Sequence, residues 1–516
     1  MRLGTVAAIG GAILLALAVV SLGVVGVLLS EDKVETNADA ADGWERRGAE
    51  PRPSVPEGAA PEVTKLGLFH TDADVDMWRE RAIRGPYRAE GDAFDNSPGE
   101  WLRLREDAEA VREAPESFLW YLPEGSGCVP SAGHGMDIAE ARNDSRTLAG
   151  AAMYALVRDD RELTEIIASV LVAQPEQQGV DFADRTRWCS PGNRDVGPVF
   201  ALAHAMTSQL LAVDLVSDDV IGPADLEGIR GWHLGLAEVI DADIESLHGS
   251  AFLGRDDGDH RLSEDWRTPQ RLHWWNDGDA RMWWDSPQVD LLHNLYNNRW
   301  ASMARYQGLV GLAFDHHHHR DRATLFFKEF IDFGVYPFGA HADLHRGFSL
   351  DPRPEGVAEG LQYMTLAAVH AFTYAEALAR AGDPSLYEYR STSGAHGTEG
   401  APPREHAEAK SLKFLAHTLA RYADGTFVRY VSEEPDEDFR LGWDVVNSGA
   451  WSRVAILSGY YRDPYIQRLY RGDGVGMPPW PADGKPYRWD AGDSGVFPAW
   501  MLWFADQEGR DYDPYP

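Results

Sequence analysis

Helical patterns of apolar residues follow one another through residues 63–516 and leave little room for other regular structure. Clear examples are MDIAEARNDSRTLAGAAMYALVRDD, GPVFALAHAMTSQLLAVDLV and GLQYMTLAAVHAFTYAEALARAG, and turn sequences such as GDPS and YRDP separate such stretches. The best strand pattern is GTFVRYVS, near residues 425–432. About a dozen helices paired as antiparallel hairpins, without a sheet, are typical of an (α/α) toroid or incomplete barrel. We therefore predict an all-α domain of this kind for residues 63–516.

Residues 1–30 form a separate segment, because no charged residue occurs between Thr5 and Leu29. Such a run exceeds the roughly 20 apolar residues that cross a bilayer as a helix. It ends in VVGVLLSEDK, without a convincing A-x-A site, which favours an uncleaved transmembrane anchor over a cleaved signal peptide. Residues 31–62 are polar, acidic and rich in Pro, Ala and Gly, so we predict a disordered linker. The body would then be extracellular, either on a single-pass cell-membrane protein or secreted.

The charge of the chain excludes one class of partner. With 82 acidic and 48 basic residues, the formal net charge is −34, which argues against nucleic acid, because nucleic-acid binding depends on neutralising phosphates. An anionic ligand would need a local basic site on this acidic protein. The two cysteines, Cys128 and Cys189, either pair in an oxidising compartment or stay unpaired and buried.

Two unusual segments each allow a functional and a structural interpretation. Residues 260–300 hold six tryptophans in a long connection, and Trp rings in a cleft suit the C–H faces of sugars. The alternative for each ring is burial in the core. The run DHHHHR at residues 315–320 resembles a metal site, but adjacent residues cannot all face one ion, so we interpret it as a polar hairpin tip. We expect no catalytic metal and no cofactor.

The hexapeptide LYNNRW at residues 295–300 precedes a helical pattern, so Asn297 or Asn298 could simply cap that helix. A cap alone does not explain why a second amide, Arg299 and Trp300 stand together at this point.

Further polar residues follow in the segment GVYPFGAHADLHRGFSL, namely His341, Asp343, His345 and Arg346. On the next helical pattern Tyr363, His370 and Tyr374 share one face, because they are seven and four residues apart.

The order of these motifs resembles the alginate lyase superfamily of polysaccharide lyases, whose core pattern is N-N-H, then G-x-x-P-x-E-L-x-R, then a Tyr. Here the order is NNR, a helical hairpin, G-x-x-P…DLHR, and a helix that begins with Tyr and ends ARAGDPSLY. The opening LGLFHTDADVDMWR and the ending DSGVFPAWMLWFAD are also similar, so the likeness covers most of residues 66–508. The resemblance implies an all-α toroid and a carbon–oxygen lyase that cleaves a uronate-containing polysaccharide, of the alginate or glucuronan type, by β-elimination.

Beta-elimination explains why such residue types belong together. The proton on C5 of a uronate is only weakly acidic while the neighbouring carboxylate is negative, so amide and cationic groups must first neutralise that carboxylate. A base then removes the proton, and an acid protonates the leaving oxygen on C4. By resemblance, Asn298 matches the carboxylate-binding Asn, Arg346 the motif Arg, and Tyr363 the catalytic Tyr. Around them we expect substrate contacts from Asn297, Arg299, Trp300 and Trp284.

The sequence departs from the family pattern in ways that leave the base open. Arg299 stands where the family has His, which removes the usual base and supplies a second cation. Asp343 replaces Glu, and the insert SLDPRPEGVAEG lengthens the gap between Arg346 and Tyr363. Tyr336 and Tyr374 remain backups for the tyrosine. If Tyr363 does not act as both acid and base, the nearest alternative bases are His341, His345 and His293.

Two other classes of function compete with a lyase. A toroidal glycoside hydrolase would need two carboxylates beside the scissile bond, which Asp277, Asp279, Glu355 and Glu359 could supply. A non-catalytic cell-surface protein would bind the polysaccharide without turnover.

Overall fold

The computed structural model describes the helical part of the chain in segments. These are residues 68–84, 100–120, 136–178, 182, 197–216, 220–251, 296–335, 339, 341, 343, 354–391, 410–423, 458–461 and 463. By its contacts the chain divides into two units, Met1–Ser54 and Val55–Pro516, and every described residue belongs to the second. The predicted anchor, linker and strand therefore lie outside the described residues. Within the described part, no helix has both the length and the apolar character that a membrane span requires.

The described residues are helical, which confirms the all-α prediction. Helices make up 83% of them, and no strand occurs among them; two isolated bridges join described residues, Val335 with His341 and Ser391 with Lys410. The α-helices are α3 (Asp72–Arg84), α4 (Glu100–Glu113), α5 (Met136–Arg158), α6 (Arg161–Gln178), α7 (Gly197–Leu215), α8 (Pro223–Ala251), α11 (Asn298–Ala313), α12 (His317–Glu329), α14 (Pro354–Arg380), α15 (Ser385–Glu388) and α17 (Leu412–Ala423). Shorter 3-10 turns are η2 (Pro115–Phe118) and η8 (Ser458–Tyr461), and η7 (Phe330–Gly334) is a π-helix that continues α12.

Side-chain caps fix where several helices begin. At α3 the Asp74 carboxylate accepts from the Thr71 backbone N–H at 2.8 Å while Thr71 Oγ1 accepts from the Asp74 N–H at 3.4 Å, a reciprocal capping box. At α6 the Asp160 carboxylate accepts from the Leu163 N–H at 3.1 Å. Pro354 starts α14, since proline fits the first helical turn. Part of the insert before Tyr363 is therefore helical, which lengthens α14 beyond the predicted start.

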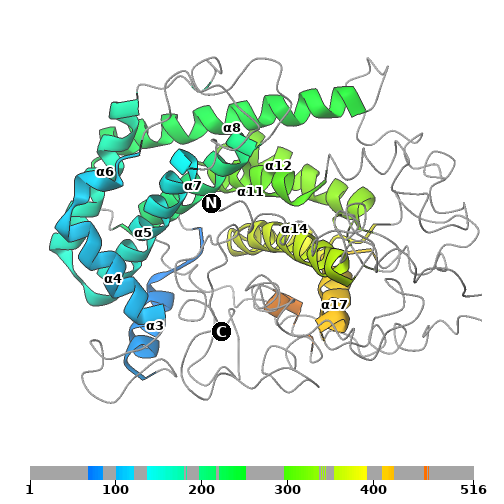
Figure 1. Cartoon of the computed structure of the whole chain (residues 1–516), viewed down its shortest axis with the longest axis horizontal. Coiled ribbons are helices and arrows are strands. Elements are labelled where there is room, and N and C mark those ends of the chain that lie inside the picture. The colour runs from blue at the N-terminus through cyan, green and yellow to red at the C-terminus, as the bar shows by residue number, and fades with distance from the viewer. Residues whose placement is uncertain are drawn as a thin grey trace, which may run out of the picture. The chain divides into compact units, whose positions relative to one another are not determined.

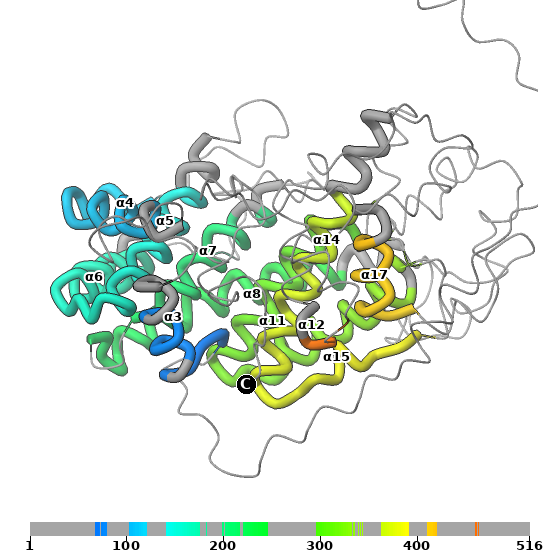
Figure 2. The backbone as a smooth tube through the Cα atoms, turned by 90° about the horizontal axis from the view of Figure 1, so that it is seen from below, coloured from blue at the N-terminus to red at the C-terminus, as the bar shows by residue number. Residues whose placement is uncertain are grey.

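Two rows of helices pack against each other (Figure 1). In the α7 row, α5 contacts α7, α7 contacts α11, and α11 contacts α14. In the α8 row, α4 contacts α6, α6 contacts α8, and α8 contacts α12. Figure 2 shows α11 and α14 from a second direction, again side by side. Alanines fill much of the α14 core surface, and such small side chains let neighbouring helices approach closely: Ala367, Ala368, Ala371 and Ala375.

Helices α11 and α14 run parallel, and two contacts set their register. The Arg305 guanidinium lies 2.8 Å from His370 Nδ1. About one turn further along both helices, Gly308 faces the ring of Tyr374, which leaves no space for a side chain at residue 308. Because the partner numbers rise together, the two chains point the same way, with residue 305 beside residue 370.

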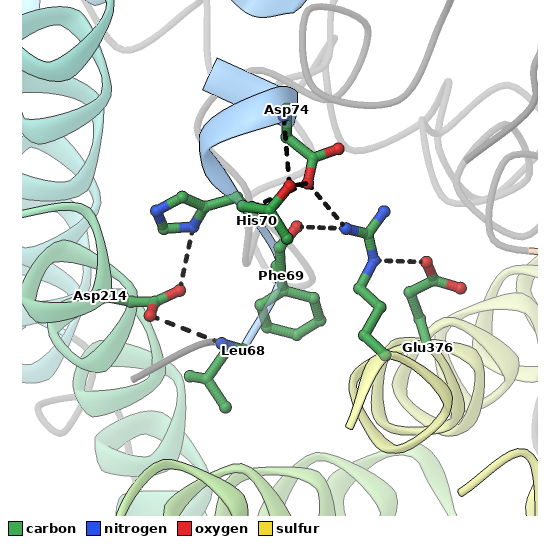
Figure 3. Close-up of polar contacts among 8 residues, drawn as sticks. Leu68, Phe69, His70, Asp74, Asp214 and Glu376 are labelled. Carbon is green, nitrogen blue, oxygen red and sulfur yellow. Dashed lines mark hydrogen bonds and ion pairs between the residues drawn. The ribbon is translucent and has the colours of Figure 1, made fainter. Parts of the chain in front are cut away.

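The segment before α3, residues 68–71, ties α7 to α14 at the far end of this row (Figure 3). Asp214 of α7 contacts His70 Nδ1 at 3.2 Å and the Leu68 N–H at 3.5 Å. On α14, Arg380 donates to the Phe69 carbonyl at 2.8 Å. Arg305 also contacts Thr207 of α7 at 3.4 Å, so Thr207 lies near His370 in the middle of the two helices. Asp214 and Arg380, which both contact residues 68–70, lie near each other at their ends. Helices α7, α11 and α14 therefore all run in one direction.

Candidate functional site

The N-terminus of α11 is fully capped by protein groups. The Asn297 side chain accepts from the backbone N–H groups of Arg299 at 2.9 Å and Trp300 at 3.1 Å, which confirms that LYNNRW starts a helix. The Asn298 N–H donates to the Asp343 carboxylate at 2.5 Å, and the Ala301 N–H to the Asn297 carbonyl at 2.9 Å. With these four donors occupied, an anion at this end must be held by side chains and not by the backbone.

The side chains of this turn are differently exposed. Asn297, Asn298 and Trp300 are buried, whereas Arg299 is partly exposed. Asn297 is committed to its cap through its carbonyl oxygen, and Trp300 packs in the core. Arg299 is thus the cation of this turn that a ligand reaches most readily, with the Asn298 amide next to it in the chain.

His341 and Asp343 form a buried link beside this turn. Both are 0% exposed. The ring of His341 stacks on Phe330, the first residue of η7, at 4.2 Å between ring centres, and its Nδ1 accepts from the Asp343 N–H at 3.2 Å. The His341 N–H in turn contacts the Met364 sulfur of α14 at 3.1 Å. This segment therefore joins α11 to α14 at the residue after Tyr363.

The register of the two helices places Tyr363 level with Asn298. Asn298 precedes Arg305 by seven residues, and Tyr363 precedes His370 by seven, so each lies two turns, or about 10 Å, before the 2.8 Å contact. Seven residues also return to nearly the same helix face. Tyr363 is partly exposed, whereas residues 364–379 of α14 are buried. Asn298, Arg299 and Tyr363 thus lie at the same end of two adjoining helices.

A buried polar layer lies two turns below this end, and of its members the sequence had singled out only His370. Arg305 is 0% exposed and bridges His370 of α14 and Thr207 of α7. Since a guanidinium only donates, His370 Nδ1 accepts and its ring hydrogen sits on Nε2. His204 of α7 packs edge-on against His370 with 5.5 Å between ring centres. The signal that was available is an arginine seven residues after Asn298, on the same face of an apolar helix.

Phe200 is a second residue that the sequence did not single out. It lies on α7 two turns before Thr207, at the level that Asn298 and Tyr363 occupy on their helices. Its ring stands edge-on to His204 at 4.6 Å, and it is only partly buried. A half-buried aromatic ring at this end is suited to contact the apolar face of a sugar.

Tyr374, a backup for the catalytic tyrosine, is engaged in helix packing. Its hydroxyl donates to the Arg320 carbonyl at 2.8 Å and lies 2.9 Å from Thr324 Oγ1, and the residue is 0% exposed. Burial raises the pKa of Tyr374 well above its usual value. These contacts leave Tyr363 as the accessible tyrosine on this face of α14.

Several predicted site residues lie outside the described part of the chain. They are Arg346, His345, His293, Tyr336, Trp284, Asp277, Asp279, Cys128 and Cys189. Glu355 and Glu359 fall within α14, where only the backbone is described. Their predicted roles stay predictions.

The histidine run forms the α11–α12 hairpin tip, as predicted. Residues 314–316 make the turn, Asp315 has φ 51°, and His317–His319 begin α12. Asp241 of α8 holds this tip, with His318 Nε2 at 2.9 Å and Arg322 Nε at 3.0 Å. Burial alone would raise the pKa of Asp241, but its hydrogen bonds, the one with His318 foremost, lower it. Among the described residues no group of three His, Cys, Asp or Glu is placed to hold a metal ion.

Comparisons with known proteins give no match to this chain, whether with family models, with curated proteins or with solved structures.

Proposed function

We propose that this chain is a polysaccharide lyase that cleaves a uronate-containing polymer by β-elimination, on the toroidal fold of the alginate lyase superfamily. The observation that carries the proposal is the shared level of Asn298 and Tyr363 on parallel helices. That level follows from the 2.8 Å contact between Arg305 and His370 and from the link between Asp343, His341 and Met364. A reaction that needs an amide, a cation and a phenol around one sugar matches this set of side chains.

In the proposed reaction the substrate carboxylate is bound by the Asn298 amide and the Arg299 guanidinium, together with Arg346 by resemblance. Neutralising that charge makes the C5 proton acidic enough to remove. The base takes this proton, the C4–O bond breaks, and its electron pair leaves with the oxygen while a C4–C5 double bond forms. Tyr363 protonates the leaving oxygen. If Tyr363 is also the base, a nearby arginine favours its phenolate form before the C5 proton is taken.

The fold and location belong to the same proposal. Parallel neighbours in the α7 row, with α7 contacting α8 and α11 contacting α12 of the α8 row, support an (α/α) toroid or incomplete barrel, because successive inner helices of such a fold run in one direction. The uncharged run of residues 5–29 supports an anchor that holds the body at the cell surface. Phe200 supports a sugar ligand, because its partly exposed ring lies at the same level along its helix as Asn298 and Tyr363 do along theirs.

The test is a turnover assay with the full-length chain in mild detergent against a panel of uronate polymers. Elimination creates an unsaturated uronate that absorbs in the near ultraviolet, whereas hydrolysis releases reducing ends without that absorbance. We expect Tyr363→Phe to lower kcat by at least about 10²-fold. Tyr374→Phe is the matched control: it removes a buried phenol from the same helix face and should keep most of the activity.

Three other results would contradict the proposal in different ways. Reducing ends without absorbance would indicate a hydrolase with paired carboxylates. Polymer binding that survives Tyr363→Phe, with no turnover by either protein, would indicate a binding protein. Equal loss of activity in Tyr363→Phe and Tyr374→Phe would exclude Tyr363 as the specific proton donor.

A further inference from the structure

We infer that His341 and Asp343 are positioning residues that hold Asn298 and Tyr363 at a fixed spacing, and that His341 does not serve as the base. This inference rests on the proposed elimination and assigns roles within its site.

The hydrogen bonding of His341 opposes proton abstraction. A backbone N–H can only donate, so the 3.2 Å contact from the Asp343 N–H makes His341 Nδ1 an acceptor. The neutral ring then carries its hydrogen on Nε2, and neither nitrogen presents a free lone pair to a substrate proton. The ring is also 0% exposed and lies flat on Phe330, with an angle of 17° between the ring planes. A base must reach the reacting carbon, and this imidazole faces the protein interior.

The same contacts suit a spacer between the two helices. The Asp343 carboxylate accepts from the first residue of α11, and the His341 backbone N–H contacts the residue after Tyr363 on α14. Because both side chains are buried, water does not compete for these bonds. A carboxylate at the N-terminus of α11 is also favoured by the partial positive charge of the helix end. Asn298 and Tyr363 are thus connected through a short chain of directional contacts.

The π-helix η7 packs against the His341 ring. Phe330 carries the His341 ring, and Gly334 leaves room for it, because a Cβ at residue 334 would lie 2.7 Å from His341 Nε2. Within η7 the Asp332 carboxylate also accepts from the Tyr389 hydroxyl at 2.9 Å, and Lys410 donates to the Asp332 carbonyl. Such π-helical turns often occur at functional sites, where they re-aim neighbouring side chains.

Two isosteric substitutions separate a positioning role from a chemical one. In His341→Asn the side-chain oxygen lies near the former Nδ1 and can still accept from the Asp343 N–H. In His341→Gln the amide lies near the former Nε2, so the Nδ1 acceptor is lost. Both variants lose the imidazole and its stacking on Phe330, which makes each the control for the other.

We expect His341→Asn to lower kcat by about threefold and His341→Gln by at least about thirtyfold, since displacements near 1 Å can cost up to about 10²-fold. The pH profile of kcat/KM should keep its shape in both variants. Thermal unfolding of the full-length chain checks that both fold. If either variant unfolds, Asp343→Asn, which keeps an oxygen for the Asn298 N–H, is compared with Asp343→Leu, which does not, and only the leucine variant should lose activity heavily.

The outcomes distinguish this inference from the proposed function. Equal, large losses in His341→Asn and His341→Gln, with the acidic limb of the pH profile missing, would identify His341 as the base and overturn the inference alone. Wild-type protein that neither binds nor cleaves any uronate polymer would overturn both. If the wild-type protein binds a uronate polymer without cleaving it, the proposed elimination is refuted. The positioning role is then tested by the affinity of each variant for a uronate oligomer. His341→Asn should preserve this affinity and His341→Gln should weaken it; equal affinities would refute the positioning role.

Discussion

Gly308→Ala tests the helix register on which the proposed site depends. An added Cβ at residue 308 would lie 2.7 Å from the Ala323 Cβ and still closer to the Tyr374 ring, where ordinary contacts begin at about 3.4 Å. The ring cannot easily yield, because it is 0% exposed, stacks on Phe327 and donates to the Arg320 carbonyl. We therefore expect α11 to be pushed away from α14 by about 1 Å.

The expected cost has three parts. Overpacking a well-packed core costs about 1–3 kcal/mol, and two weakened hydrogen bonds of Tyr374 add about 1 kcal/mol each. Replacing glycine by alanine inside a helix stabilises the folded state by about 1 kcal/mol, which offsets part of this cost. The free energy of unfolding should thus fall by about 2–4 kcal/mol, measured by equilibrium urea unfolding of the full-length chain with far-ultraviolet circular dichroism.

The matched control is Gly231→Ala within α8, where no atom lies within 4 Å of the added Cβ. It should raise stability by up to about 1 kcal/mol through helix propensity alone. The same shift of α11 should separate Asn298 from Tyr363 and lower kcat by about 10²-fold in Gly308→Ala, with no loss in Gly231→Ala. If both glycine variants were equally stable and active, the register of α11 against α14 would be refuted, together with the alignment it provides.

Three further substitutions probe charge, sugar contact and pH. Arg299→Ala should raise KM for a uronate polymer by about 10-fold or more and leave KM for the carboxyl-reduced, neutral polymer unchanged; equal effects on both polymers would exclude a carboxylate contact. Phe200→Ala should raise KM and lower the free energy of unfolding by about 1 kcal/mol, because the ring is only half-buried against the core; a much larger loss of stability would make it a core residue. Burial raises the pKa of Asp107 to about 7, so the folded protein keeps a proton that the unfolded chain releases, and stability falls as pH rises from about 4 to 7. Asp107→Asn should match wild type near pH 4 and, after allowance for partial exposure, be about 2 kcal/mol more stable at pH 8 in urea unfolding; the reverse order would refute the burial effect.

The sequence predicted local features well, because caps and periodicity act over a few residues. The all-α class and a cap by Asn297 or Asn298 follow from such signals, and the histidine hairpin tip follows from its polar run between two helical patterns. Helix starts were less certain. The pattern GLQYMTLAAVHAFTYAEALARAG predicted a helix from Gly360, but α14 begins at Pro354, because proline fits the first helical turn.

Long-range register could not be predicted from local patterns. The pairing of Arg305 with His370 joins residues 65 positions apart, and the space for Tyr374 depends on a glycine that looks like an ordinary weak point of a helix. For the site, the motif order predicted which residues belong together, and this grouping stays a prediction. Only the tertiary contacts assign His341 to a buried stack on Phe330, because periodicity does not reveal which face of a loop histidine is covered.

At the start of α11, one amide caps the helix, and the second amide and the arginine are not needed for the cap. Asn297 and Asp343 use up the free N–H groups of the first turn, so the helix end is stabilised without any ligand. A carboxylate arriving from solvent therefore gains little from the helix end itself, and its charge must be met by the Asn298 amide and the Arg299 guanidinium. On a chain with a net charge of −34, the proposed binding of a carboxylate by Asn298 and Arg299 would let a polyanion bind where the protein as a whole repels it. The second amide and the arginine are thus additional to the cap, and in the proposed elimination they bind the carboxylate at the helix end that is level with Tyr363.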